Sequence, residues 1–357
     1  MVRPRVAVIL GGRSSEHSIS CLSARSVLRA LDRDSYEVRA LGIRRDGGWV
    51  EVPDDPEEWT GPDWLGSDPA LPHVPSGASD APTIPESLLV DVDVAFPVLH
   101  GPWGEDGTVQ GLLETAGVPY VGSGVLASAA AMDKPVMKSL LRAAGLPVGP
   151  WCTVTDRDWA HSRARIRERI DSLGLPVFVK PARAGSSVGI TKVARPEDLE
   201  AAIETARAWD PRVIVEAAIE PAREIECGVL TDANGAPRSS VCAEIAVRSG
   251  HEFYDFEAKY LDDSADLIVP AQVDEAVAAH VGDLSERAFE ALGCEGLARV
   301  DFFVRPDGHV VINEVNTMPG FTPISMFPRM WAASGVAYPQ LVDHLVVDAL
   351  RRGVGLR

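Results

Sequence analysis

The sequence predicts an α/β protein, with a parallel sheet in an N-terminal domain and mixed α+β structure in the rest of the chain. Two observations support this prediction. Strand-like and helix-like segments alternate from the N-terminus onward, an order typical of parallel strands that are joined by helices. The chain also has 357 residues, more than the roughly 250–300 at which a single hydrophobic core stops growing, so we expect two or three domains.

The first elements predict a β-α-β unit. Residues 6–10 form an apolar strand that ends at Gly11, residues 14–18 open a helix over 19–31, and a second strand follows at 36–43. This order favours a Rossmann-like domain in which the two strands pair in parallel.

The rest of the N-terminal domain is less regular. Residues 46–86 are rich in Pro, Asp, Gly and Trp without periodicity, which predicts a surface excursion. A strand at 92–99 then leads to His100, a helix covers about 108–116, and residues 118–122 close the domain. We expect two further domains, with a helical pattern over 127–144, strands between 148 and 219, and domain ranges of 1–126, 127–221 and 222–357.

Composition excludes several classes of protein. The net charge of −18 argues against a nucleic-acid or anionic-membrane surface, because either would normally show a basic patch. Five scattered cysteines without a CxxC motif support neither a disulfide framework nor a zinc site. No apolar run has the length of a membrane span, and the N-terminal strand is too short for a signal peptide. We therefore expect a cytoplasmic protein that uses no membrane or nucleic-acid partner.

Residues 297–320 are the most informative segment. They place Arg299 and three oxygen-bearing side chains, Asp301, Glu314 and Asn316, in two strands that are otherwise apolar. Buried charges are costly unless something pairs them. Oxygen ligands without nearby His or Cys favour Mg²⁺, which usually completes its shell with water and substrate phosphates. The segment therefore predicts a nucleotide site.

The register of this hairpin remains open in the sequence. A two-residue connection at Pro306-Asp307 would put Asp301 and Glu314 on one face, whereas a bulge at Gly308 would shift that parity by one. The alternative interpretation is an ordinary hairpin whose carboxylates are simply solvated.

Two more segments favour a nucleotide. A strand at 176–181 carries Lys180 into a loop of small residues at 182–190, whose N–H groups can approach phosphate oxygens closely. The loop matches neither the Walker A nor the GxGxxG pattern, and alone it would be an ordinary turn. The strand at 212–219 contains an acid and can offer its backbone to an adenine edge, with further acids at 223–226 for ribose; a solvated acidic turn is the alternative.

These features belong to a series of motifs that runs in order through nearly the whole chain. The motifs resemble those of the D-alanine–D-alanine ligases, which are ATP-grasp enzymes; they are His100-Gly101 with 104–107, 122–124, Met132-Asp133-Lys134, Val179-Lys180-Pro181, 185–189, 254–260 and 313–320. The resemblance implies a substrate-binding and dimerisation domain followed by a two-part ATP-grasp fold. It also implies ATP-dependent ligation of two D-alanines through a D-alanyl phosphate, for peptidoglycan precursors, by a homodimer.

The resemblance also implies roles for individual residues. Two Mg²⁺ ions, for which Mn²⁺ can substitute, would be bound by Asp301, Glu314 and Asn316, with Glu314 bridging them. ATP would be bound by Lys134, Lys180, Ser187, Glu216, Ala217, Ala218, Ile219, Glu224, Lys259 and Asn313. In the substrate site, Glu16 would bind the ammonium of the first D-alanine and would be linked to Ser186 and Tyr260. Arg299 and the Gly320 N–H would stabilise the oxyanion. The remaining residues that would bind substrate are His100, Ser325 and Met326.

The sequence departs from the family pattern at one place and leaves two alternatives. Ala217-Ala218 replace bulkier residues and Pro221 looks like an insertion, so the ribose acid is Glu224 or Glu226. A D-alanine–D-lactate ligase would share the nucleotide site, although Tyr260 favours the dipeptide-forming type. A dinucleotide-binding protein built on the first glycines would lack the third spaced glycine and the acidic ribose partner.

Overall fold

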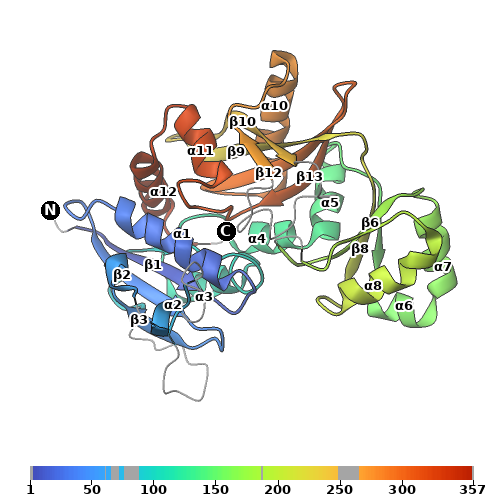
Figure 1. Ribbon diagram of the computed structural model, residues 1–357. Helices are drawn as coiled ribbons and strands as arrows, with labels where there is room; N and C mark the ends of the chain where they lie inside the picture. The colour runs from blue at the N-terminus through green and yellow to red at the C-terminus, as the bar shows by residue number, and fades with distance from the viewer. Residues whose placement is uncertain are drawn as a thin grey trace.

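The computed structural model describes residues 3–60, 62–65, 72–75, 88–185, 188–247 and 265–355. Its strands form three sheets, and each sheet lies in a lobe of its own (Figure 1). Within the described residues, no helix has both the length and the apolar character needed to cross a bilayer.

The N-terminal lobe contains the predicted parallel sheet, with strand order β3-β2-β1-β4. β1 (Arg5–Gly11) pairs in parallel with β2 (Glu37–Ile43) and with β4 (Val94–Pro97), and α1 (His17–Ala30) connects β1 to β2. β1 is apolar along its length because a parallel strand is covered on both faces, and its residues after Arg5 are buried. The β-α-β prediction is confirmed.

The predicted surface excursion is only partly correct. Residues 49–52 form β3 (Trp49–Val52), which pairs antiparallel with β2. The segment continues through η1 (Pro56–Glu58) and α2 (Pro62–Leu65), where the buried rings of Trp59 and Trp64 stack with centroids 4.6 Å apart. A four-residue strand is too short to show a period, which is why the sequence pattern missed this part of the core.

The helical pattern over 127–144 forms two helices rather than one, α4 (Val125–Met132) and α5 (Lys134–Ala143). The break lies at Asp133, whose carboxylate accepts a hydrogen bond from the Val136 N–H at 3.1 Å. Pro135 in the first turn of α5 has no N–H to donate, so a new helix starts here at little cost. The break also places Lys134 and Lys138 on one face of α5.

The central lobe has an antiparallel sheet of order β5-β8-β6-β7. Its strands are β5 (Trp151–Val154), β8 (Val213–Ala217), β6 (Val177–Pro181) and β7 (Thr191–Val193). One core joins this sheet to the helices of the lobe, which are α6 (Asp156–His161), α7 (Arg163–Asp171) and α8 (Leu199–Arg207), the last preceded by η3 (Pro196–Asp198).

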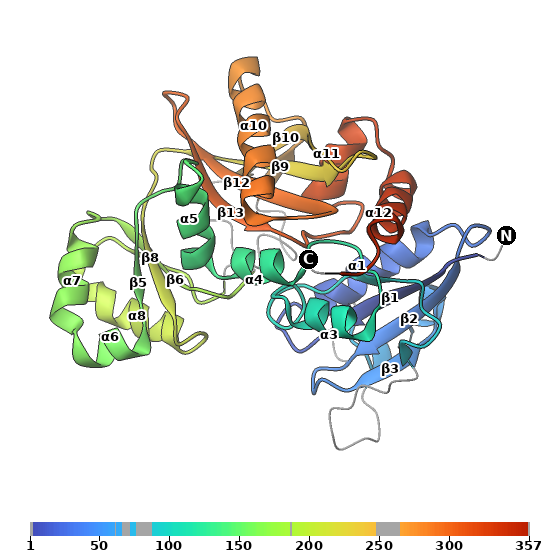
Figure 2. The ribbon, with the colours of Figure 1, turned by 180° about the vertical axis from the view of Figure 1, so that it is seen from behind.

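The C-terminal lobe is a five-stranded antiparallel sheet of order β11-β10-β9-β12-β13. The strands are β9 (Arg223–Thr231), β10 (Pro237–Val247), β11 (Ala265–Ile268), β12 (Leu297–Val304) and β13 (Val310–Asn316). α10 (Glu275–Leu292) lies across the back of the sheet, together with α4 and α5 (Figure 2). α11 (Met326–Ala333) contacts β9 and β10.

The last helix, α12 (Tyr338–Arg352), returns to the N-terminal lobe. Its residues Leu341 and Leu345 share one buried core with Val6 and Val8 of β1, and Figure 1 shows α12 beside α1. On the N-terminal side, α3 (Thr108–Ala116) follows β4. The N-terminal sheet therefore depends on the end of the chain for its core, although the domain limits predicted above remain predictions.

Candidate active site

A cavity of about 790 Å³ is lined by residues of all three lobes. The residues that the sequence singled out come from distant parts of the chain, and most of them line this cavity. They are Glu16, His100, Lys134, Lys180, Glu216, Ala217, Ile219, Glu224, Arg299, Asp301, Asn313, Glu314, Asn316, Gly320, Ser325 and Met326.

Five predicted residues stand apart from that set. Ala218 is not among the cavity-lining residues that the structure describes, and its N–H donates to the Pro176 carbonyl at 3.1 Å, as in a strand pair. A direct contact of the Ala218 N–H with nucleotide is therefore not supported. The other four lie outside the described residues, so their roles remain predictions: Ser186, Ser187, Lys259 and Tyr260.

The hairpin of β12 and β13 resolves the question of register. Its turn follows the bulged alternative, with Gly308 at a φ of +82°. A second irregularity just after Asp301 shifts the pairing again, so that Asp301 lies opposite Glu314 and Arg299 lies opposite Asn316. Neither single alternative was therefore complete. Two shifts together place all four polar side chains at facing positions.

Arg299 is held by carboxylates in this hairpin. Its Nε and Nη2 donate to the two carboxylate oxygens of Asp301 at 2.6 and 2.7 Å, and its Nε lies 3.3 Å from Glu226 Oε1. Burial lowers the pKa of the guanidinium, but Asp301 and Glu226 raise it further, so the group stays charged. Asp301 also accepts from Asn316 Nδ2 at 3.0 Å.

The same side chains fit a cation that arrives with a substrate. Within the described residues, no group of three or more His, Cys, Asp or Glu side chains could hold a metal ion. The protein offers instead two carboxylates and one amide, from Asp301, Glu314 and Asn316. Mg²⁺ is commonly bound by one or two carboxylates together with substrate phosphates. The ligand set therefore fits Mg²⁺ on a nucleotide.

A lysine that sequence reasoning missed completes the opposite wall. Glu216 lies between Lys138 Nζ at 2.6 Å and Lys180 Nζ at 2.7 Å. Burial raises the pKa of Glu216, but the two lysines lower it more, to about 2. Lys134 Nζ donates to the Ala184 carbonyl at 2.8 Å and lies 3.8 Å from Glu314 Oε2. The four-residue spacing from Lys134 was the signal that could have identified Lys138.

Glu16 lies where two glycine loops meet. It is buried at the start of α1, and a Cβ atom on either Gly101 or Gly185 would come within 2.6 Å of its Oε2. The absence of side chains at both glycines therefore lets the N-terminal and central lobes close around this carboxylate.

A second acid, Glu105, was quoted in a sequence motif but given no role. Its Oε1 accepts from the Gly101 N–H at 2.8 Å and its Oε2 from the Met318 N–H at 3.2 Å. Burial, together with nearby Glu16, raises the pKa of Glu105 to about 8, although both N–H groups lower it. His100, predicted to bind substrate, lines the cavity with both ring nitrogens already engaged by protein atoms.

The second-substrate residues lie at the start of α11. Ser325 Oγ lies 2.8 Å from Thr322 Oγ1 and accepts from the Thr322 N–H at 3.2 Å. Met326 is the first residue of the helix. Helix N-termini bind carboxylates readily because their first N–H groups lack partners within the helix, which agrees with the predicted role.

Three lobes around a cavity with paired lysines on one wall and carboxylates on the other define an enzyme of the ATP-grasp class. Two family models match the chain, "D-ala D-ala ligase N-terminus" over residues 5–123 and "D-ala D-ala ligase C-terminus" over residues 140–347. The chain belongs to the D-alanine–D-alanine ligase family, as the motifs predicted. The dinucleotide-binding alternative is therefore wrong.

Relatives and solved structures agree with this membership. The D-alanine–D-alanine ligase of Frankia casuarinae is 56% identical and that of Kineococcus radiotolerans 53% identical, covering 99% of this chain and 98% and 99% of the relatives. The D-alanine–D-alanine ligase structure from Coxiella burnetii has 34% identity and a TM-score of 0.80, covering 98% of this chain and 94% of that one. The VanG D-Ala:D-Ser ligase from Enterococcus faecalis has 35% identity and a TM-score of 0.82, covering 98% and 100%.

Proposed function

We propose that the protein joins two D-alanines into D-alanyl-D-alanine and converts one ATP to ADP and phosphate. The observation that carries this proposal is the gathering of lysines, metal-type ligands and an arginine from all three lobes around one cavity. The full-length relatives named as D-alanine–D-alanine ligases support it.

The lysine wall is the phosphate end of the site. Lys134 and Lys180 bind the ATP phosphates, and Glu216 keeps Lys180 charged and in place by a 2.7 Å ion pair. Asp301, Glu314 and Asn316 would hold Mg²⁺, or Mn²⁺ in its place, and the ion would supply neutralisation of phosphate charge.

The adenine and the ribose of ATP lie along the same side of the cavity as the lysines. The segment from Glu216 to Ile219 meets the adenine edge with its backbone groups other than the Ala217 and Ala218 N–H groups, which bind the Pro150 and Pro176 carbonyls. Glu224 takes the ribose hydroxyls. Both Glu224 and Glu226 line the cavity, and the 3.3 Å contact of Glu226 with Arg299 supports Glu224 as the ribose acid. Asn313, at the irregularity in β13, lines the cavity on the nucleotide side.

Two chemical steps follow from this arrangement. The carboxylate of the first D-alanine attacks the γ-phosphorus, ADP leaves, and a D-alanyl phosphate forms. The neutral amine of the second D-alanine then attacks the acyl carbon, phosphate leaves with the C–O bond electrons, and the proton that the amine loses goes to the departing phosphate. Positioning and charge neutralisation supply most of such catalysis. The predicted contacts of Lys259 with the transferring phosphate, and of Ser186 and Tyr260 with Glu16, belong to this proposal.

Each substrate group has a partner in the cavity. Glu16 pairs with the ammonium of the first D-alanine, and Arg299 with the Gly320 N–H stabilises the oxyanion of the tetrahedral intermediate. Ser325 and the Met326 N–H hold the carboxylate of the second D-alanine. We further propose a cytoplasmic homodimer, joined through the N-terminal domain, that supplies peptidoglycan precursors.

One observation favours a second candidate for the acceptor. The VanG D-Ala:D-Ser ligase is as similar in fold as the D-alanine–D-alanine ligases, so the fold does not select the acceptor. Incubating the protein with ATP, Mg²⁺ and D-alanine, alone or with D-serine or D-lactate, and weighing the products separates these activities. A dipeptide of D-alanine as the main product in every mixture supports our proposal, and a mixed product in excess would replace it.

A single substitution tests the metal assignment. Glu314→Gln keeps the volume of the side chain but removes its charge, so we expect an intact fold, nearly abolished ADP release and a greatly increased Mg²⁺ requirement. Asp307→Asn, in the exposed turn of the same hairpin, is the matched control and should retain full activity. Normal turnover of the Glu314 variant at ordinary Mg²⁺ concentration would show that the carboxylate is only part of a polar hairpin.

A further inference from the structure

The Gly320 N–H, the proposed donor to the oxyanion, lies in a short turn. The turn consists of Met318-Pro319-Gly320-Phe321, and we call it the 318–321 turn. Gly320 lines the cavity, and its N–H has no hydrogen-bond partner among the described residues. The turn follows directly after β13, so regular strand pairing ends just before it. Something outside the sheet must therefore fix the direction of the Gly320 N–H.

The N-terminal lobe supplies those contacts from one side. Both polar atoms of the Met318 peptide are bound by residues of the loop after β4. Glu105 Oε2 accepts from the Met318 N–H at 3.2 Å, and His100 Nδ1 lies 3.0 Å from the Met318 carbonyl. A carbonyl only accepts, so Nδ1 of His100 carries a proton. Burial lowers the pKa of the ring and favours its neutral form, in which Nε2 is an acceptor.

Ser23 of α1 continues this network to the far end of the turn. Its hydroxyl lies 3.1 Å from His100 Nε2 and donates to it, and its oxygen accepts from the Phe321 N–H at 3.4 Å. The Phe321 carbonyl is bound by Tyr338 Oη of α12 at 2.6 Å. The bonds form one consistent donor-to-acceptor series, in which Ser23 and His100 are buried and Glu105 and Tyr338 are partly exposed.

We propose that Glu105 and Ser23, acting through Met318, His100 and Phe321, are positioning residues that hold the 318–321 turn so that the Gly320 N–H points into the cavity. This inference rests on the proposed function of Gly320. If the inference holds, side chains of the N-terminal lobe set the direction of the Gly320 N–H, which belongs to the C-terminal lobe. The N-terminal lobe then contributes to the second chemical step.

Amide hydrogen exchange and steady-state kinetics together test the positioning role of Glu105 and Ser23. In Ser23→Ala and Glu105→Ala, we expect faster amide exchange in the peptide that contains the 318–321 turn and a turnover number at least tenfold lower, with ATP affinity within twofold of wild type. Glu105→Gln can accept only one of the two N–H groups, so its loss should be intermediate. A purely structural role would lower the unfolding temperature without this split between turnover and ATP affinity.

Matched controls come from the same elements. Among the described residues, Ser26 Oγ donates within α1, to the Leu22 carbonyl, and Asp106 accepts from the N–H groups of Trp103 and Thr108 in its own loop. Ser26→Ala and Asp106→Asn should leave both readouts near wild type. Equal turnover in the Ser23 and Ser26 variants, or a loss without faster exchange, would overturn the inference. Exchange is measured without substrates, so it remains decisive even if wild type forms no dipeptide.

Discussion

Arg299 has two proposed roles, a structural one as the partner of Asp301 and a catalytic one at the oxyanion. We expect Arg299→Lys to retain a positive partner for Asp301, and hence the fold, but to lose the two-pronged geometry that only a guanidinium offers. If Arg299 stabilises the oxyanion, turnover should fall about 100-fold or more while ATP affinity changes little. Steady-state kinetics with varied ATP and varied D-alanine measures both.

The control for this prediction is Arg305→Lys, at the exposed turn of the same hairpin, which should be neutral. An Arg299 variant whose only defect is a raised Michaelis constant for ATP would place this arginine in nucleotide binding instead.

Glu216 gives a prediction on pH. Because its pKa in the fold, about 2, lies below the ordinary 4.5, the ionised form is favoured by folding. Its contribution to stability is therefore complete above pH 4.5 and is lost as the pH falls from 4.5 toward 2. Glu216→Gln should be less stable by about 3–5 kcal/mol at pH 7, since it leaves two buried lysines without their carboxylate.

Calorimetric unfolding between pH 7 and pH 3 checks this prediction. The difference between wild type and Glu216→Gln should shrink as the pH falls. Glu220→Gln, which removes a half-exposed partner of Lys192, should change stability by under about 1 kcal/mol. A Glu216 variant whose deficit stays constant down to pH 3 would contradict the ion-pair explanation.

At the scale of elements, the loop that carries Gly185 is set by close approach. A Cβ on this residue would lie 2.6 Å from Glu16 Oε2, so Gly185→Ala should keep the loop from closing on the first D-alanine. We expect at least a tenfold lower kcat/KM for D-alanine with little change in the unfolding temperature.

Gly111→Ala is the matched control for Gly185→Ala. Its Cβ would meet no described atom outside its own helix closer than Val125 Cγ2 of α4, at 4.0 Å, and alanine is the better helix former by roughly 0.5–1 kcal/mol. Full activity and slightly higher stability are expected there. Comparable losses in both variants would indicate a general effect of removing glycine rather than contact with Glu16.

The helices and strands also show which elements the local sequence pattern can predict. Apolar pattern and β-α-β order predicted β1, β2 and the β12–β13 hairpin, because each of these strands is long enough to show its pattern. The four-residue β4 was predicted as part of the longer apolar run over 92–99. The break between α4 and α5 at Asp133 was missed, since an apolar face continues across it. The second irregularity in the hairpin leaves no mark in composition, and only pairing with a partner strand reveals it.

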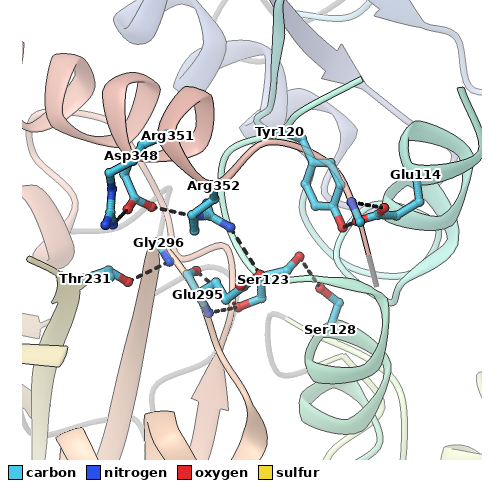
Figure 3. A network of polar contacts seen from close by, with 11 residues as sticks. Glu114, Tyr120, Ser123, Ser128, Thr231, Glu295, Gly296, Asp348, Arg351 and Arg352 are labelled. Carbon is cyan, nitrogen blue, oxygen red and sulfur yellow. Dashed lines mark hydrogen bonds and ion pairs between the residues drawn. The ribbon is translucent and has the colours of Figure 1, made fainter. Parts of the chain in front are cut away.

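At the scale of the molecule, the C-terminal helix joins two lobes through a network of charged and polar side chains (Figure 3). Arg352 donates to Asp348 at 2.8 Å within α12 and to Glu295 at 3.1 Å, just before β12. The Glu295 backbone in turn contacts Ser123, at the end of the N-terminal lobe: its N–H donates to Ser123 Oγ at 3.2 Å. The network therefore connects α12, the C-terminal sheet and the first interlobe segment.

We expect Arg352→Ala to lower stability by about 1.5–3 kcal/mol, the range for hydrogen bonds to charged groups, without altering the turnover of folded enzyme, since Arg352 does not line the described cavity. Arg351→Ala removes a more exposed partner of Asp348 and should cost about 0.2–1 kcal/mol. Thermal unfolding and kinetics at 25 °C check both. A reduced turnover number in Arg352→Ala would show that this network also shapes the active site.

The sequence by itself determined the class of fold, the family and the type of most cavity residues, because strand period, glycine loops and oxygen ligands are local properties of the chain. It could not show that Lys138 joins Lys180 at Glu216, or that Glu105 and Ser23 reach the 318–321 turn. Those contacts join residues far apart in the chain, and only the packing of three lobes brings them together. Tertiary structure also decided the register of Asp301 against Glu314, because the hairpin contains two shifts of one residue in the same direction, and the second shows only in the pairing of β12 with β13.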